Sequence, residues 1–226
     1  MTVETEYGPV NGCFRSTILG LDYINFQGIP YMKAPTGKLR FRDAQPPEKW
    51  NEPFDATKEG PAYPNRDIFS QELNGQEDAG VINIYTKNLA PKKLFPVMFF
   101  IHGGGWYSGS NQTNVYGADY ILQKDVILVA INYRLGAMGF LSLDDPNLGV
   151  PGNQGLKDQV FALKWVQRNV SKFGGDPNNV TIFGESAGGG SVSYLLVSDA
   201  AEGLFHKAIS MSGTVFSPWA VQPRRN

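Results

Sequence analysis

Cysteine is nearly absent from this sequence of 226 residues, in which Cys13 is the only one. An internal disulfide is therefore excluded, and a reducing compartment, the cytoplasm, is the simplest expectation. Residues 1–4 lack the basic start and apolar run of a signal peptide, so secretion is expected only if the N-terminus is incomplete. The glycosylation sequons at Asn111, Asn169 and Asn179 are then expected to stay unmodified.

Long apolar runs and an excess of charge are missing as well. The longest apolar runs, around residues 96–101 and 126–131, are far shorter than the roughly 20 residues that span a bilayer. The net charge of −1 argues against nucleic acid and anionic membranes as partners. With 42% apolar and 18% charged residues the composition is globular, and we expect one domain over residues 1–226.

What is present is an alternation of buried strands and helices. Residues 95–101, 126–132 and 180–183 are short, nearly unbroken apolar runs that predict buried strands. Residues 155–173 carry apolar side chains at spacings of three and four, which predicts the clearest helix. This order indicates an α/β fold with a mostly parallel sheet covered on both faces. Residues 3–14 alternate around two turn signals and predict a small antiparallel hairpin.

Other segments complete the predicted organisation. Residues 81–85 and 207–211 read as further strands, and residues 23–31 as an added edge strand. Residues 33–76 are dense in proline, glycine and charge, which indicates a long excursion over the surface.

The strand at residues 180–183 leads into the pattern G-x-S-x-G, with Ser186 at its centre. A segment long enough for a helix follows. In a strand–turn–helix context this pattern is typical of a nucleophilic serine on a strained turn, where Gly184 and Gly188 let helix and strand pass closely. The alternative is a glycine-rich turn whose serine only caps the helix.

A second run of glycines follows the strand at residues 95–101 and reads His102-Gly-Gly-Gly-Trp106. An H-G-G-G run upstream of G-x-S-x-G builds the oxyanion hole of esterases from exposed backbone N–H groups. We assign the N–H groups of Gly104, Gly105 and Ala187 to such a hole, at about 3 kcal/mol per donor. The alternative is a flexible glycine loop.

With these motifs in place, the chain resembles the N-terminal part of a type-B carboxylesterase, a family with the α/β-hydrolase fold that includes the cholinesterases. The insect carboxylesterases are the nearest in character. Besides the two motifs, the matching segments lie at residues 26–31, 39–41, 77–78, 83–85, 133–136, 152–159, 173–177 and 203–209.

The resemblance implies a serine esterase that cleaves uncharged carboxylic esters through an acyl-enzyme, with a small-molecule ester as partner and no metal or organic cofactor. It implies that Glu185 is a buried carboxylate tuning the field at the site, and that Trp106 and Trp219 line the acyl pocket. It also implies two structural ion pairs, Arg40 with Glu77 and Arg134 with Asp158. The family's disulfide is missing, since Ala79 replaces one cysteine and none stands near Tyr63, which argues against choline-type specificity.

Two members of the expected catalytic triad are not found. The order in this fold is serine, then an acid, then histidine, and the sequence after Ser186 offers only Asp199, Glu202 and His206. His206 begins a strand parallel to the one that ends at Ser186, which places it roughly 20 Å from the hydroxyl. His102 precedes the serine, and the resemblance assigns it to shaping the glycine loop.

We therefore expect the chain to be truncated before the last strands of the fold, with the acid and the base outside it. The strand at residues 207–211 would then be an exposed apolar edge through which the chain self-associates. Two other functions stay open: an inactive binding or adhesion protein of the same fold, and an enzyme similar to hormone-sensitive lipase, which shares the H-G-G-G run.

Overall fold

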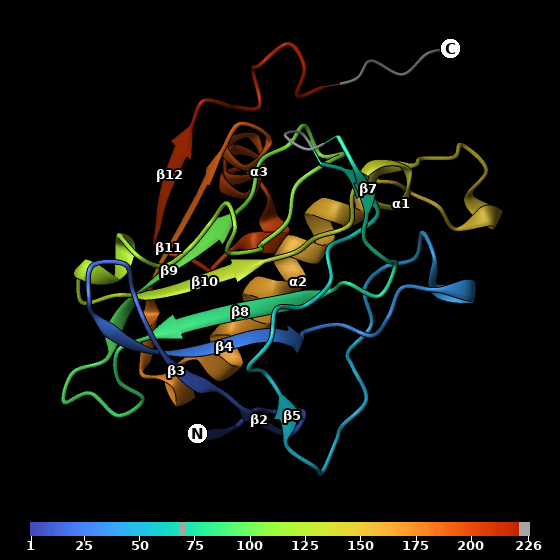
Figure 1. Cartoon of the computed structure of the whole chain (residues 1–226). Coiled ribbons are helices and arrows are strands. Elements are labelled where there is room, and N and C mark those ends of the chain that lie inside the picture. The colour runs from blue at the N-terminus through green and yellow to red at the C-terminus, as the bar shows by residue number, and fades with distance from the viewer. Residues whose placement is uncertain (68–70, 222–226) are drawn as a thin grey trace.

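The computed structural model describes residues 1–67 and 71–221. Its centre is a seven-stranded sheet in the order β12-β11-β9-β10-β8-β4-β3 (Figure 1). The strands are β3 (Cys13–Ser16), β4 (Asp22–Pro30), β8 (Val81–Thr86), β9 (Phe95–Ile101), β10 (Ile127–Ile131), β11 (Gly175–Glu185) and β12 (Lys207–Met211). The predicted strands at residues 95–101 and 207–211 are confirmed to the residue.

The sheet is mixed, with more antiparallel pairing than predicted. The four strands from β12 to β10 run parallel, whereas β8, β4 and β3 pair antiparallel. The α/β class is thus confirmed, but "mostly parallel" holds for only one half of the sheet. The physical reason lies in the connection between β8 and β9. Residues 87–94 are too few for the crossover helix that a parallel return requires, so the chain reverses direction there.

The predicted N-terminal hairpin is present over residues 2–11 and lies apart from the main sheet, whereas residues 13–14, which were also predicted for it, belong to β3. It pairs β1 (Thr2–Glu4) with β2 (Pro9–Asn11), and β5 (Phe54–Asp55) adds to β2. The predicted edge strand, β4, is second from the edge, because β3 covers it. Within the long excursion, β6 (Asn65–Arg66) and β7 (Leu73–Asn74) form a separate small ladder.

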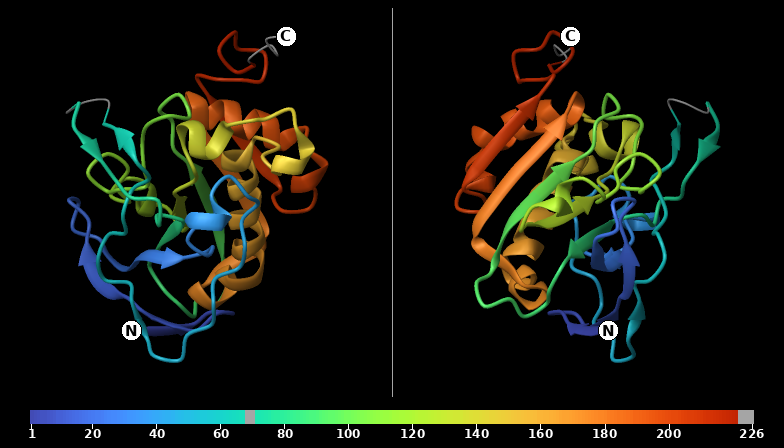
Figure 2. Two further views of the ribbon diagram at one scale, coloured as in Figure 1. Left: turned by 90° about the vertical axis from the view of Figure 1, so that its right-hand side faces the viewer. Right: turned by 60° about the vertical axis from the view of Figure 1, so that its left-hand side comes forward.

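Three α-helices are described: α1 (Gly136–Phe140), α2 (Gln154–Asn169) and α3 (Ala187–Leu196). Figure 2 shows α2 and α3 on the same side of the sheet. The predicted helix at residues 155–173 is confirmed, with its last turn tightened into a 3₁₀ helix, Val170–Phe173, that ends at Gly174 in the left-handed region. No helix within residues 1–67 and 71–221 combines the length and apolarity needed to cross a membrane.

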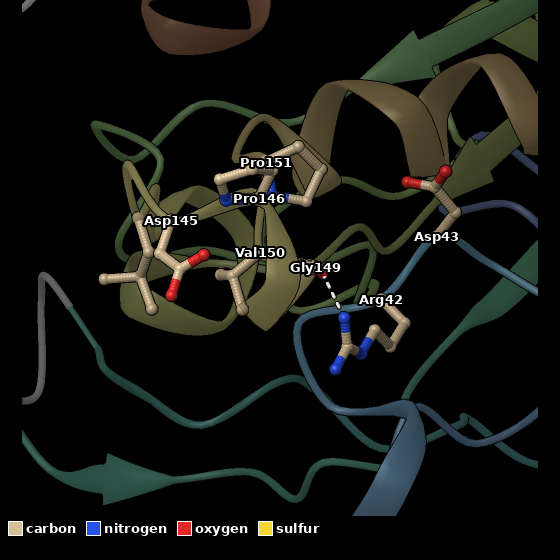
Figure 3. Close-up of a pocket in the computed structure, with 8 residues that line it drawn as sticks. Arg42, Asp43, Asp145, Pro146, Gly149, Val150 and Pro151 are labelled. Atoms are coloured by element: carbon tan, nitrogen blue, oxygen red, sulfur yellow. Dashed lines mark hydrogen bonds between the residues drawn. The ribbon is translucent and has the colours of Figure 1, made fainter.

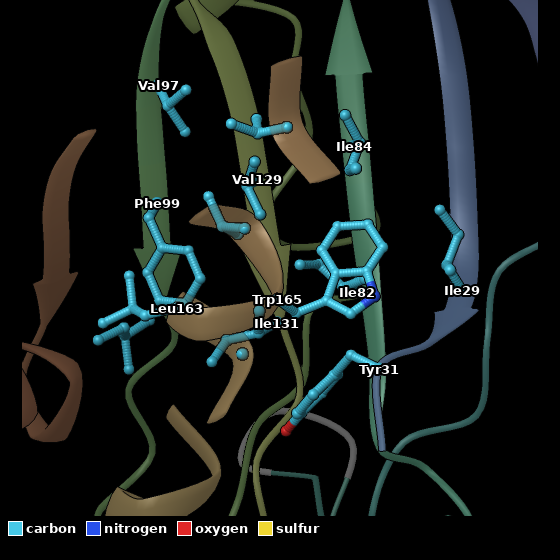
Figure 4. Close-up of a cluster of buried hydrophobic side chains, with 14 of the residues drawn as sticks. Ile29, Tyr31, Ile82, Ile84, Val97, Phe99, Val129, Ile131, Leu163 and Trp165 are labelled. Atoms are coloured by element: carbon cyan, nitrogen blue, oxygen red, sulfur yellow. The ribbon is translucent and has the colours of Figure 1, made fainter. Parts of the chain in front are cut away.

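The main core fills the space between the sheet and these helices. Trp165 of α2 is fully buried there among apolar side chains of the central strands (Figure 4). The opposite face of the sheet carries a smaller cluster around Phe100 and Leu128, which residues 116–122 cover without an α-helix. The prediction of two covered faces therefore holds only in part, because the second cover is irregular chain.

Three consecutive glycines let α3 approach three different neighbours. A Cβ atom on Gly188 would collide with the carbonyl of Ile101, and one on Gly189 with the carbonyl of Met211. A Cβ on Gly190 would lie 3.1 Å from the ring of Trp106. Alanine would favour the helix by about 1 kcal/mol at each position, so close packing outweighs helix propensity here.

Candidate active site

Ser186 stands at the apex between β11 and α3, with φ 56° and ψ −120°. Its main chain is fixed on both sides: its N–H donates to Met211 O at 2.9 Å, and its carbonyl accepts from Gly190 N at 2.9 Å. The side chain makes no capping hydrogen bond with the helix. The alternative that this serine only caps α3 is therefore wrong. A backbone in this sparsely populated region is the kind of local strain that concentrates at functional sites.

The glycine run lies directly beside Ser186. A Cβ atom placed on Gly103 would be 3.3 Å from Ser186 Cβ. The run is a closed turn, because the N–H groups of Tyr107 and Ser108 both donate to Gly104 O, at 3.1 and 2.9 Å. Gly104 and Gly105 have φ of 104° and 63°, which glycine adopts without strain. Gly104 and Gly105, two of the three residues assigned to an oxyanion hole, thus directly follow the residue that borders Ser186.

The three predicted donors have no acceptor of their own. Among the residues that the structure describes, the N–H groups of Gly104, Gly105 and Ala187 make no hydrogen bond to the protein. Ala187 is the first residue of α3, where an N–H group has no intrahelical partner and the helix dipole favours negative charge. The expectation that these amides form an oxyanion hole is therefore compatible with their hydrogen bonding.

His102 fixes the direction of one of these amides. Its Nδ1 lies 2.8 Å from Gly103 O and must donate to it, so Nε2 is left without a proton. Burial lowers the pKa of His102 to about 4, which keeps the ring neutral at pH 7. In a trans peptide the carbonyl and the following N–H point in opposite directions. Holding Gly103 O toward the imidazole therefore aims the N–H of Gly104 away from it.

Tyr133 holds the imidazole in turn. The two rings stack with centroids 4.4 Å apart and planes 17° from parallel. The Tyr133 hydroxyl also donates to His102 O at 2.8 Å. Both residues are fully buried, so the glycine turn begins from a rigid base.

Glu185 is exposed, which corrects the prediction of a buried carboxylate. It lies on the same face of β11 as Phe183, the face that no helix of the described chain covers, and this leaves the carboxyl group open to solvent. A Cβ on Gly103 would be 3.1 Å from its Oε2, so the carboxylate borders the glycine turn. The pKa of Tyr116 is raised, mainly by burial and secondly by the negative charge of Glu185.

The two predicted tryptophans lie against each other. The ring centroids of Trp106 and Trp219 are 5.5 Å apart, at an interplanar angle of 55°. A Cβ on Gly213 would lie 2.9 Å from the Trp219 ring and would collide with Ser186 O. The tryptophan pair is thus adjacent to the main chain of the serine.

Two cavities flank these elements. One of about 460 Å³ opens beside the glycine turn and is lined by Gly103, Gly104, Ser108 and Tyr116, together with mostly polar residues within the ranges 62–67, 72–74 and 109–115. The other, of about 280 Å³, lies between Arg42 and the loop 143–151 and contains none of the predicted site residues (Figure 3). There Arg42 Nη1 donates to Gly149 O at 2.6 Å. Of these two cavities, only the first is lined by a residue assigned to the oxyanion hole, Gly104.

Neither of the two histidines in the sequence can act on the Ser186 hydroxyl. The His206 amide donates to Val180 O at 2.8 Å, and its Nδ1 accepts from Val180 N at 3.1 Å. Val180 precedes Ser186 by six residues of extended strand, or roughly 20 Å. The Nδ1 of His102 already donates its hydrogen bond to Gly103 O. Within the described ranges, no group of three or more His, Cys, Asp or Glu side chains forms a metal site.

Both predicted ion pairs are present and differ in burial. Arg134 and Asp158 form a two-pronged pair with distances of 2.6 and 2.7 Å, and their side chains are 1% and 0% exposed. Arg40 and Glu77 are 2.9 Å apart and partly exposed. The buried pair joins α2 to the start of α1, whose Gly136 N–H donates to Trp106 O at 2.7 Å.

The fold and this arrangement are those of an α/β-hydrolase esterase. The model of the "Carboxylesterase family" matches residues 1–226, and the chain belongs to that family. This confirms the resemblance found in the motifs.

Among curated relatives, "Esterase B1" of Culex pipiens is 47% identical over 226 residues, which make up 100% of this chain and 42% of the relative. "Juvenile hormone esterase" of Tribolium castaneum is 47% identical over 220 residues, 96% of this chain and 37% of the relative. The solved structure of juvenile hormone esterase from Manduca sexta has a TM-score of 0.88 at 44% identity, covering 95% of this chain and 41% of that one. The chain thus spans less than half the length of these relatives.

Ser191 and Gln159 were not predicted from the sequence; they are fully buried polar residues on α3 and α2, and the Ser191 hydroxyl accepts from both Gln159 and Trp106. A signal was available. Gln159 lies next to Val160 in an otherwise apolar stripe, and Ser191 follows the three glycines of α3. A polar side chain on a buried helix face requires a partner.

Proposed function

We propose that this chain is the nucleophile-bearing part of a serine carboxylesterase. The observation that carries the proposal is the relation of Ser186 to its surroundings. Its side chain makes no capping bond, its backbone is strained, and three unpaired amides belong to the turn beside it and to the residue after it.

In this mechanism the Ser186 hydroxyl loses its proton to a base as its oxygen attacks the carbonyl carbon of an ester. The carbonyl oxygen becomes an oxyanion that accepts hydrogen bonds from Gly104, Gly105 and Ala187, each donor contributing about 3 kcal/mol. The base then gives this proton to the leaving oxygen as the tetrahedral intermediate collapses, which releases the alcohol and leaves an acyl group on Ser186. Attack by water on the acyl-enzyme releases the carboxylic acid and restores the hydroxyl.

The base and its acidic partner are proposed to come from residues outside the sequence described here. Support comes from the positions of His102 and His206, both bound elsewhere, and from relatives more than twice as long. Without a base an enzyme of this type loses several orders of magnitude in rate, although the oxyanion hole retains some catalysis.

The substrate is proposed to be an uncharged carboxylic ester whose two halves lie on opposite sides of Ser186. The acyl half would lie against the rings of Trp106 and Trp219, which offer apolar surface. The alcohol half would enter the cavity of about 460 Å³ beside Gly103 and Gly104. Its polar lining suits an alcohol that carries hydrogen-bonding groups.

A second candidate is favoured by the missing base. In it, the chain by itself binds esters or carboxylic acids and does not turn them over. Both candidates share the oxyanion hole, and they differ in whether the Ser186 hydroxyl is activated.

The deciding experiment compares the chain with a C-terminally extended form that supplies a histidine. We expect the extended form to hydrolyse p-nitrophenyl butyrate and to be labelled at Ser186 by a fluorophosphonate, with the adduct mapped by mass spectrometry. Ser186→Ala should abolish both. Ser212→Ala is the matched control, because Ser212 has nearly the same strained φ, 57°, and should change neither. Rapid labelling of Ser186 in the unextended chain would overturn the account of the missing base.

We further propose that the protein works in a reducing compartment, the cytoplasm. The lone cysteine supports this, as does the burial of two sequons: Asn111 is 1% exposed and Asn169 is fully buried. Fractionation of the source cells, with a glycosidase mobility assay, tests it. A glycan on the mature protein would contradict it.

A further inference from the structure

Trp106 is held in a backbone conformation that a bulky residue rarely adopts. Its φ is 61°, in the left-handed region, where a residue with a side chain is sterically strained. It follows Gly105 directly, so its conformation is part of the turn that presents the proposed oxyanion donors. Such strain persists only where surrounding contacts determine it.

One of those contacts is a face of α3 shaped to receive the indole. Gly190 provides the space, since a Cβ there would lie 3.1 Å from Trp106 Cζ2 and 3.2 Å from Cη2. Tyr194, one turn along the helix, has its ring centroid 6.4 Å from that of Trp106. Ser191, next to Gly190, provides the polar contact.

The Ser191 hydroxyl accepts two hydrogen bonds at once. Trp106 Nε1 donates to it at 2.9 Å, and Gln159 Nε2 donates at 3.1 Å. Ser191 and Gln159 are both fully buried. One oxygen atom therefore joins the glycine turn, the helix that begins at the nucleophile, and α2. A buried indole N–H that lost this acceptor would carry a desolvation penalty, so the bond fixes where the ring lies.

We propose that Ser191 is a positioning residue that fixes the indole of Trp106 and thereby the shape of the wall against which the acyl chain of the substrate lies. Gln159 supports it by orienting the Ser191 oxygen. The inference deepens the proposed function and depends on it only for the identity of the ligand. It assigns Ser191 no contact with the substrate.

The first test measures the position of the indole without any ligand. The chain has four tryptophans, so ¹⁵N labelling gives four indole N–H signals, and Trp106→Phe identifies the one from Trp106. In Ser191→Ala we expect this signal to shift and its N–H to exchange with solvent about tenfold faster, which corresponds to the loss of one buried hydrogen bond. The Trp50 signal should not move, since its Nε1 donates to Pro9 O at 2.8 Å, away from α3.

A matched variant separates positioning from general destabilisation. Val192→Ala removes buried atoms from the same helix and leaves both bonds of Ser191 in place. It should leave the Trp106 exchange rate within about twofold of the parent under native conditions. Equal acceleration in Ser191→Ala and Val192→Ala, or no acceleration in Ser191→Ala, would overturn the proposal.

The second test uses acetate, butanoate and hexanoate as probes of the acyl side. In the parent chain we expect the Trp106 signal to shift on titration, with tighter binding as the chain lengthens. In Ser191→Ala the preference for hexanoate over acetate should fall at least about threefold, because the wall is no longer fixed. An unchanged preference would refute the role in specificity. If no probe shifts Trp106 even in the parent chain, the acyl side of the proposed function fails, while the exchange experiment still decides the positioning of Trp106.

Discussion

The buried ion pair between Arg134 and Asp158 allows a quantitative prediction about stability. Asp158→Asn would leave the Arg134 guanidinium buried without its counter-charge, at 1% side-chain exposure. Removing one partner of such a pair costs about 3–5 kcal/mol. Against a total stability of about 5–15 kcal/mol, this is a large share. With an m-value near 2 kcal/mol per molar urea, the unfolding midpoint should fall by about 1.5–2.5 M.

The second ion pair, between Arg40 and Glu77, is more exposed and serves as the internal control for the effect of burial. Arg40 and Glu77 lie 2.9 Å apart with side chains 43% and 29% exposed. Because water and salt screen such a pair, Glu77→Gln should cost no more than about 1 kcal/mol. Urea unfolding followed by circular dichroism measures both variants under one condition.

Replacing both members of the buried pair completes the design. Arg134→Met combined with Asp158→Leu removes both charges and should recover most of the loss, since no unpaired charge remains. The reasoning is refuted if Asp158→Asn shifts the midpoint no more than Glu77→Gln does. It is also refuted if the double variant is less stable than Asp158→Asn alone.

Three further predictions concern the site, the sheet edge and the nucleophile helix. Burial lowers the pKa of His102 from 6.5 to about 4, so as the pH falls the unfolded chain binds the extra proton before the folded chain does. The free energy of unfolding should therefore fall by about 3 kcal/mol between pH 6.5 and pH 4. His102→Gln should remove this part of the pH dependence in urea titrations, and an identical pH dependence in the variant would contradict the prediction. In the described chain β12 is an edge strand, with Ile209 46% and Met211 37% exposed. Sedimentation should therefore show self-association, and Ile209→Lys should reduce it. A parent chain that stays monomeric at high concentration would count against this prediction. Gly188→Ala should destabilise the chain by about 1–3 kcal/mol or more, although alanine has the better helix propensity, because its Cβ would collide with the carbonyl of Ile101. Gly203→Ala is the control and should destabilise the chain less, because a Cβ there meets open space. Equal melting temperatures of the two variants would show that the close approach at Ile101 is not tight.

The sequence by itself determined the local chemistry. The G-x-S-x-G pattern after an apolar run placed Ser186 on a sharp turn, because only glycines at 184 and 188 allow that approach. Apolar periodicity located β9, β12 and α2, because the pattern of burial follows directly from the pattern of side chains. The two ion pairs were predicted from the resemblance to the carboxylesterase family, and the position of His206 was predicted from strand direction.

Tertiary structure decided what depends on distant segments. Glu185 is exposed because no described helix covers its face of β11, and the sequence around position 185 holds no information about that cover. The direction of β8 follows from the short connection to β9, while its apolar side chains fit either direction. The contact of Ser191 with Trp106 joins residues 85 positions apart. Contacts of this kind arise only when folding brings the glycine turn onto α3, because hydrogen bonds between distant residues require the whole sheet to set their separation.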